Sequence, residues 1–191
     1  MRNSTIALNS HYSFDRKTNI AIFVPLFVLA MAFGAYIRIP LPFTPVPITL
    51  QTFFVLLSGA MLGKRFGLLA QISYVAIGAF GLPVFQNYLA GPAALLGPTG
   101  GYIMGFIYAS YVVGRLLENK DATAPKVFAS FLAGIAIIYL CGAMWLVSAY
   151  KMPPVQALYV GILPFIPGDI LKISLATAIY TKISKRTKEL I

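Results

Sequence analysis

Two residues of opposite charge stand three positions apart in an apolar stretch, FIPGDILKIS, which runs from Phe165 to Ser174. The carboxylate of Asp169 can accept two N–H hydrogen bonds from a cyclic urea or amide, and the ammonium of Lys172 can donate to the carbonyl of that same group. A structural interpretation stays open, because Asp suits a helix start and an i,i+3 Asp–Lys pair can neutralise itself. The pair favours a site for a polar but uncharged ligand, in which the two charges are held apart as an empty socket.

The segment GPTGG is a weaker candidate for ligand contact. The backbone at Thr99, Gly100 and Gly101 would let a ligand approach closely, with amides pointing outward at the start of a helix. The same residues could simply end a loop. The segment therefore supports a site only in combination with other residues.

Four further polar residues have two interpretations each. Gln51 and Asn87 are amides in apolar surroundings, so they either meet a ligand or bond neighbouring helices. Arg38 and Lys151 either anchor the chain at a membrane interface or reach a ligand carboxylate. Sequence alone does not choose between these roles.

Several kinds of chemistry have no matching residues in the sequence. GAMLGK, Gly59 to Lys64, lacks the spacing of an ATP-binding loop, and the one histidine, His11, has no cysteine or carboxylate cluster around it. We therefore expect no enzyme activity, no metal and no cofactor. A self-sufficient proton-coupled carrier for a small vitamin is the alternative function, although such carriers usually have acidic residues in more than one span and here Asp169 stands alone.

The composition is that of an integral membrane protein. Of 191 residues, 59% are hydrophobic and 10% are charged, and the mean hydropathy is +0.81. Too little polar surface is available to cover a water-soluble core of this size. The net charge of +10 is explained by basic residues in cytoplasmic loops, and we expect no nucleic-acid partner.

The apolar runs predict an all-α membrane protein with six transmembrane helices. Each run is continuous rather than alternating, which favours helices over a barrel. The domain boundaries expected are a cytoplasmic N-terminal tail over 1–19, a six-helix membrane domain over 20–186 and a cytoplasmic C-terminal tail over 187–191. The predicted spans are 20–37, 48–62, 66–81, 102–118, 126–148 and 154–185.

Basic residues predict the orientation of these spans. If the N-terminus is inside, twelve of the fifteen lysines and arginines fall on the cytoplasmic side. Arg38 and Lys151 are then the exceptions on the outer side, and Lys172 is within the membrane. This asymmetry predicts that both termini are cytoplasmic.

The last run is too long for one straight span, because it would reach about 48 Å against a hydrocarbon core of about 30 Å. Pro164 and Pro167 also interrupt it. We expect a short outer or re-entrant piece over 154–163, followed by a final helix that begins at Gly168 or Asp169.

Two outward connections are unusual in composition. Residues 37–48 contain prolines at 40, 42, 45 and 47, which predicts an extended, semi-rigid strap. Residues 81–102 are long, rich in glycine and proline, and uncharged, which is typical of a segment folded back over the bundle as a lid.

Small residues four apart, Ala30 and Gly34, lie on one face of the first span. Such a face lets another helix approach closely. The neighbour is either a helix of the same chain or a membrane partner.

Four motifs together resemble the BioY family, the biotin-specific substrate-binding subunits, or S-components, of energy-coupling factor (ECF) transporters. The resemblance spans residues 20–186 in order. The motifs are PFTPVPITLQTFFVLLSGAMLG (42–63), GAFGLPVF (78–85), GPTGGYIMGF (97–106) and PFIPGDILK (164–172).

This resemblance implies a six-helix S-component fold in a prokaryotic cell membrane, biotin as the ligand, and a coupling protein with two ATPases as partners. It places Asp169 and Lys172 at the ureido ring of biotin. It also implies that the GPTGGY backbone, through Tyr102, and the loop carrying Asn87 help to enclose the ligand. The face of Ala30 and Gly34 resembles a docking surface, and Arg38 is a guess for the carboxylate of biotin.

Overall fold

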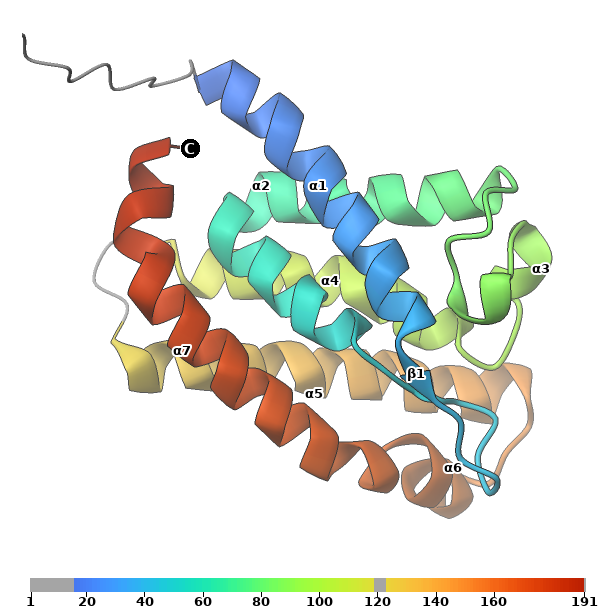
Figure 1. Ribbon diagram of the computed structural model, residues 1–191. Coiled ribbons are helices and arrows are strands. Elements are labelled where there is room, and N and C mark those ends of the chain that lie inside the picture. Colours follow the sequence, from blue (N-terminus) through green and yellow to red (C-terminus); the bar gives the residue numbers. More distant parts are fainter. Residues whose placement is uncertain (1–15, 119–122, 191) are drawn as a thin grey trace, which may run out of the picture.

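The computed structural model describes residues 16–118 and 123–190, and it shows a bundle of helices (Figure 1). Most of the predicted N-terminal tail thus lies outside the described residues, while residues 16–19 belong to the first helix. The α-helices are α1 (Arg16–Tyr36), α2 (Gln51–Ala79), α3 (Pro92–Leu95), α4 (Gly100–Leu116), α5 (Ala124–Ala149), α6 (Pro154–Gly161) and α7 (Ile166–Leu190).

Helices of membrane-spanning length make up much of this bundle. Within the described residues, three helical stretches are long and apolar enough to cross a membrane, namely 51–79, 124–149 and 154–184. A shorter apolar helix covers 20–36. The mostly helical architecture predicted from the sequence is confirmed.

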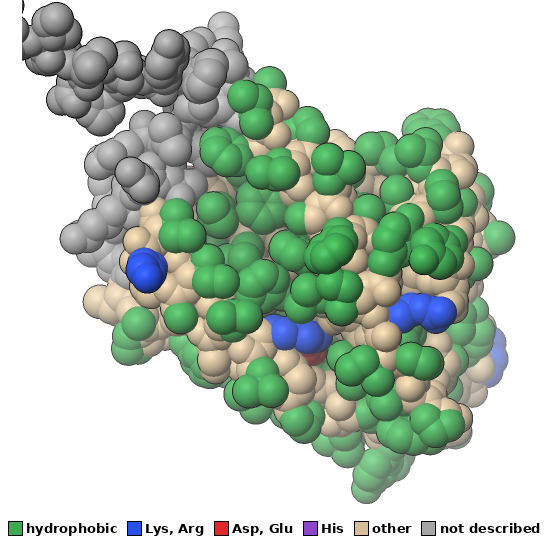
Figure 2. All heavy atoms as spheres, viewed as in Figure 1, with side chains coloured by type: hydrophobic (Ala, Val, Ile, Leu, Met, Phe, Trp, Pro, Cys, Tyr) green, Lys and Arg blue, Asp and Glu red, His purple; other side chains and the backbone are tan. Residues whose placement is uncertain are grey.

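The outer surface is apolar as well. Phe80 and Leu171 are among many large hydrophobic side chains that point outward, with exposed fractions of 89% and 73%. Figure 2 shows hydrophobic side chains over most of one face, with only scattered charges. A continuous apolar surface of this extent suits lipid rather than water.

The second and third predicted spans, 48–62 and 66–81, form one bent helix, α2. The bend lies at Gly63, whose φ of 75° and ψ of 176° are not helical. A positive φ is easily adopted only by glycine, so the chain changes direction here without a separate loop. Figure 1 shows the two halves of α2 running in different directions. The two predicted spans are therefore joined by a bend.

Small and polar residues join α2 to α4 in the middle of the bundle. A Cβ on Gly59 would lie 2.3 Å from the carbonyl oxygen of Ser110, so the backbones touch there. The hydroxyls of Ser58 and Ser110 are 3.1 Å apart, and Gln71 Nε2 donates to Ser58 Oγ at 2.8 Å. All three polar side chains are buried. Close approach and internal hydrogen bonds of this kind hold helices together in lipid.

Charges gather where α2 bends past the end of α4. Lys64 Nζ lies 2.8 Å from a carboxylate oxygen of Glu118, and an Arg115 nitrogen lies 2.6 Å from the other oxygen. Hydrogen bonds from Lys64 and then Arg115 lower the pKa of the exposed Glu118 carboxyl. A Cβ on Gly114 would lie 2.4 Å from the Lys64 backbone nitrogen, so the two ends are also in close contact.

The proline-rich strap, residues 37–48, is closed by a short antiparallel pair of strands. β1 (Arg38–Ile39) pairs with β2 (Ile48–Thr49). The Thr44 hydroxyl donates to the Val160 carbonyl oxygen in α6 at 2.7 Å. The extended connection predicted from the prolines agrees with this hairpin.

The uncharged connection after α2 folds back onto the bundle. It contains a 3₁₀ turn, η1 (Gln86–Tyr88), followed by α3. Phe85 is buried against Gly78, and the Gly91 amide donates to the Gly78 carbonyl oxygen at 2.7 Å. This segment therefore packs over the C-terminal end of α2 and leads into the N-terminal end of α4, which agrees with the fold-back predicted from the sequence.

The last apolar run is divided as predicted, although the final helix begins two residues before Gly168. α6 ends at Gly161, a 3₁₀ turn, η2 (Leu163–Phe165), follows, and α7 begins at Ile166. Pro167 lies in the first turn of α7, where an amide donor is not needed. Asp169 is likewise in this first turn. α7 continues to Leu190, so the C-terminal tail predicted over 187–191 is mostly helix.

Candidate binding site

A pocket lies between the strap, the connection after α2 and the helices α2, α4, α5 and α7. The space between these elements is about 560 Å³ with the open mouth included, but the part into which the centre of a water molecule fits is only about 50 Å³. Its lining residues are Val46, Pro47, Ile48, Thr49, Gln51, Thr52, Tyr74, Phe85, Gln86, Thr99, Tyr102, Ile103, Phe106, Ile138, Tyr139, Phe165, Asp169 and Lys172.

Asp169 and Lys172 line one side of this pocket, but they are in contact with each other. Lys172 Nζ lies 2.7 Å from Asp169 Oδ1, and the Asp169 residue is only 3% exposed. The sequence interpretation expected two charges held apart as an empty socket. The structure instead shows the self-neutralising i,i+3 pair, and this pair borders the pocket.

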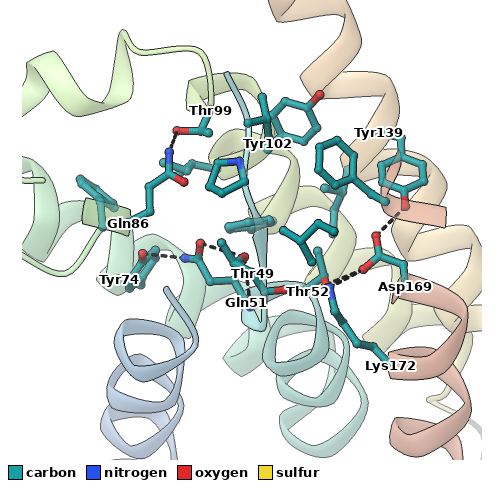
Figure 3. Close-up of a pocket in the computed structure, with 18 residues that line it drawn as sticks. Thr49, Gln51, Thr52, Tyr74, Gln86, Thr99, Tyr102, Tyr139, Asp169 and Lys172 are labelled. Atoms are coloured by element: carbon teal, nitrogen blue, oxygen red, sulfur yellow. Dashed lines mark hydrogen bonds and ion pairs between the residues drawn. The ribbon is translucent and has the colours of Figure 1, made fainter. Parts of the chain in front are cut away.

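The Asp169 carboxylate has two more partners, which sequence reasoning missed. The Thr52 hydroxyl donates to Oδ1 at 2.9 Å, and the Tyr139 hydroxyl donates to Oδ2 at 2.5 Å (Figure 3). Both residues line the pocket. Three donors therefore fix the position of this carboxylate.

Lys172 also ties α7 to the end of the strap. Its ammonium donates to the Thr49 carbonyl oxygen at 2.7 Å and contacts the Thr52 hydroxyl at 3.2 Å. With the bond to Asp169, three acceptors surround a group that has three N–H donors. The charge of Lys172 is thus satisfied within the chain.

Two amides lie on other parts of the wall. Gln51 Nε2 donates to the Tyr74 hydroxyl at 2.7 Å, so Gln51 both lines the pocket and joins the two halves of α2. Gln86 Nε2 donates to the Thr99 hydroxyl at 3.0 Å. The predicted amide, Asn87, has a left-handed φ of 60°, is exposed and does not line the pocket. Its neighbour Gln86 occupies the inward position.

Apolar and aromatic side chains complete the pocket. Phe85 comes from the connection after α2, Phe106 from α4 and Phe165 from η2. A flat ring and an alkyl chain could pack against such walls, while the polar groups fix orientation. Within the described parts of the chain, no group of three His, Cys, Asp or Glu side chains could hold a metal ion.

Comparison with known sequences agrees with this architecture. The sequence model of the BioY family matches residues 6–189. The chain belongs to the BioY family. This confirms the resemblance seen in the four motifs. BioY proteins are transporter components, so the chain is not an enzyme.

Similar proteins cover nearly the whole chain. Biotin transporter BioY of Thermotoga maritima is 44% identical over 160 residues, which are 84% of this chain and 92% of that protein. A probable biotin transporter BioY of Pyrococcus horikoshii is 40% identical over 164 residues, covering 86% and 95%. Biotin transport is the function that these two names give to the relatives themselves.

A solved structure shares the fold. The crystal structure of the S-component for biotin from an ECF-type ABC transporter matches with a TM-score of 0.83 and 26% identity, covering 89% of this chain and 93% of that one. This BioY chain therefore has the S-component fold, and it is a membrane protein.

The glycines of GPTGGY pack against neighbouring segments in this BioY chain rather than facing the pocket. A Cβ on Gly100 would lie 1.9 Å from the Leu95 carbonyl oxygen, and one on Gly101 would lie 2.2 Å from Trp145 Cβ. Neither glycine lines the pocket, whereas Thr99 does. The predicted close approach is therefore between helices.

Tyr102 lines the pocket and also holds two helices together. Its hydroxyl donates to the Gly161 carbonyl oxygen at the end of α6 at 2.8 Å. Its ring fits against Gly142 of α5, where a Cβ would lie 2.2 Å from the ring. Tyr102 is thus a lining residue whose position is fixed by packing and by its hydrogen bond to α6.

Arg38 does not reach the pocket. It is exposed on β1 and is absent from the lining residues, and Lys151 is likewise exposed and absent. The guess that Arg38 binds a carboxylate has no support from this geometry. Among the lining residues, all of which lie in the described part of the chain, Lys172 is the one cation.

The small-residue face of α1 packs largely inside the chain. A Cβ on Gly34 would lie 2.9 Å from the Phe54 ring and 3.1 Å from the Gln51 backbone nitrogen, because the start of α2 sits against it. Ala30 is half-buried. Gly34 is therefore not available to a partner, and only the Ala30 part of this face remains open.

Proposed function

We propose that this BioY protein is the high-affinity biotin-binding membrane subunit of an ECF-type vitamin importer. It captures biotin from outside and releases it inward together with a coupling protein and two ATPases. The observation that carries this proposal is the buried Asp169 carboxylate, held by Thr52 and Tyr139 at the wall of a pocket in a chain with the S-component fold.

The ureido ring of biotin suits this carboxylate. Its two N–H groups are donors, and Asp169 has two oxygens, of which Oδ2 has only Tyr139 as a partner among the described residues. The ring carries no charge, so binding leaves the neutral Asp169–Lys172 pair neutral. A charged group placed here would instead remain uncompensated.

The rest of the ligand meets apolar surroundings. The second ring and the alkyl chain of biotin would lie against Phe85, Phe106 and Phe165, which line the pocket. Burial of such groups supplies affinity, and the polar groups supply orientation. The chain needs no cofactor for this binding.

Six membrane crossings with both termini cytoplasmic are part of the proposal, and the membrane is the prokaryotic cell membrane. The bend of α2 supports this count, because it turns one long helix into two crossings. The start of α1, the bend of α2 and the end of α7 lie toward one end of the bundle, and the strap and α6 lie toward the other (Figure 1). The basic residues of the loops gather toward the former end.

The energy source lies in the partners. The sequence has no ATP-binding loop, so the ATPases of this proposal are separate proteins, and the fold match to an S-component of an ECF-type ABC transporter supports them as partners. The coupling protein would dock on α1 at the open part of its face around Ala30. Ala30→Trp should then abolish assembly while leaving biotin binding unchanged, and assembly that persists would remove this face from the proposal.

One experiment tests the ligand directly. The chain is purified in detergent, and the small molecule that comes with it is identified by mass spectrometry. We expect biotin. Ligand-free protein should then bind biotin with an affinity that riboflavin and thiamin do not compete away. A different vitamin in the purified protein would overturn the assignment.

A further inference from the structure

Gln86 has an unsatisfied polar atom inside the pocket. The residue is 9% exposed and lines the pocket. Its Nε2 donates to the Thr99 hydroxyl, but its Oε1 is buried and has no hydrogen-bond partner among the described residues. Figure 3 shows this oxygen directed toward the pocket interior. A buried amide oxygen without a partner is costly, which indicates that a ligand group completes this position.

The Gln86 amide can offer either a donor or an acceptor to the pocket. A threonine hydroxyl both donates and accepts hydrogen bonds. If the amide turns over, the Thr99 hydroxyl donates to Oε1 and the Nε2–H₂ group faces the pocket instead. In either orientation of the amide, Gln86 and Thr99 keep one hydrogen bond between them. The position therefore fits a carboxylate in one orientation and an amide N–H in the other.

Gln86 and Thr99 lie across the pocket from Asp169 and Lys172 (Figure 3). A ligand that places its ring at Asp169 would extend its other end toward this side. The cation of the lining, Lys172, is already surrounded by three acceptors of the chain. The far end of the ligand is therefore recognised by neutral dipoles and not by a basic residue.

We infer that Gln86, oriented by Thr99, is a specificity-determining residue that receives the carboxyl end of the ligand. This inference rests on the proposed function, because it takes biotin as the ligand. It implies that the pocket distinguishes biotin from its primary amide only weakly. A salt bridge at this position would discriminate strongly between the two.

The wild-type protein gives the first test. Binding of biotin and of biotin primary amide is measured by isothermal titration calorimetry at pH 8.5 on ligand-free protein. We expect the two dissociation constants to agree within about tenfold, as for exchange of one hydrogen-bonded group for another. A loss of about a hundredfold or more for the amide would indicate a cation at the carboxylate and would overturn the inference.

Gln86→Glu gives the sharper test, with Gln156→Glu as the matched control. Gln156 is exposed on α6, so the same chemical change there should leave both ligands unaffected. In Gln86→Glu, two carboxylates would face each other, and repulsion of like charges should weaken biotin binding by about tenfold or more. Biotin amide can donate to the new carboxylate, so its affinity should change by less than about threefold. The ligand preference therefore shifts from biotin toward the amide by about threefold or more.

The outcomes separate this inference from the proposed function. If the wild type binds neither ligand, the proposed function fails. If the wild type binds biotin but Gln86→Glu weakens the binding of both ligands equally, or of neither, Gln86 is not at the carboxyl end and the inference alone fails.

Should Gln86→Glu not fold, Gln86→Leu replaces it. That variant should lose about tenfold or more in biotin affinity and less in amide affinity, since a bond to a charged group is the stronger one. Equal losses would again overturn the inference.

Discussion

Replacement of Asp169 by Asn is the most direct perturbation of the proposed site. The carboxylate accepts hydrogen bonds from Thr52, Tyr139 and Lys172, and the ureido N–H groups of biotin would use the remaining lone pairs of the same oxygens. Asn keeps the size but has no charge and only one acceptor oxygen. A hydrogen bond to a charged group contributes about 1.5–3 kcal/mol, and about 1.4 kcal/mol changes affinity tenfold. We expect biotin affinity to fall roughly 10- to 150-fold.

The same substitution also affects stability, and the two effects must be separated. Asp169→Asn leaves the Lys172 ammonium without its counter-charge, and that side chain is only 14% exposed. Removing one member of a fully buried pair lowers the free energy of unfolding by about 3–5 kcal/mol. We expect a smaller loss here, because part of the lysine still reaches solvent. A double variant, Asp169→Asn with Lys172→Met, removes both charges. We expect it to recover stability but not biotin affinity.

Calorimetric titration of the purified, ligand-free variants measures this prediction. Size-exclusion chromatography and thermal unfolding establish first that each variant is folded. Unchanged affinity in a folded Asp169→Asn protein would refute the role of this carboxylate. Recovery of affinity in the double variant would also refute it, because the loss would then come from an unpaired lysine.

Three further predictions concern residues around the site and in the bundle. Tyr139→Phe should lower biotin affinity by less than about tenfold, since one neutral donor is lost and the Asp169–Lys172 pair remains; a titration that shows a larger loss would give Tyr139 a direct ligand contact. Thr44→Val removes the strap's bond to α6 and should speed biotin dissociation in stopped-flow measurements, whereas an unchanged rate would mean that the strap does not retain the ligand. Gly59→Val should strongly lower the unfolding temperature in detergent, because its Cβ would lie 2.3 Å from the Ser110 carbonyl oxygen. Gly63→Ala is the control. A Cβ on Gly63 meets nothing within 4 Å, so this substitution strains only the backbone φ and should lower the unfolding temperature less.

The part of the site that sequence could predict depends on residues that are rare in membranes. Asp169 and Lys172 stand out because ionisable groups are costly in an apolar run. Thr52 and Tyr139 do not stand out, because hydroxyl residues are common in membrane helices. They meet Asp169 across 117 and 30 positions of sequence. These three residues meet only because the helices that carry them, α2, α5 and α7, pack against one another.

Neighbouring amides show a second limit of sequence reasoning. Asn87 and Gln86 are adjacent and chemically alike, but the connection between α2 and α4 has no regular period that would tell which one faces inward. In the structure Asn87, with a φ of 60°, is exposed, while Gln86 is buried. A backbone angle of this kind follows from the fit of the whole connection over the bundle.

Small residues illustrate a third limit. The spacing of Ala30 and Gly34 predicts a close helix contact, and the structure has one, but the partner is the start of α2. Likewise the glycines at 100 and 101 predict close approach, and Trp145 takes the space that a ligand was expected to use. The spacing of small residues shows where another segment can approach closely. It does not show which segment that is.

The pairing of Asp169 with Lys172 changes how capture of the ligand should proceed. Because the three N–H donors of Lys172 already have acceptors, a ureido carbonyl can bind it only by displacing one of them. The Thr52 hydroxyl is the longest of the three contacts, at 3.2 Å, and this hydroxyl also donates to Asp169, so losing Lys172 does not leave it unpaired. The carbonyl of Thr49, at 2.7 Å, belongs to β2 and ties the strap to α7. The ligand should therefore displace Thr52 first, which would leave the strap anchored over the pocket while biotin is bound.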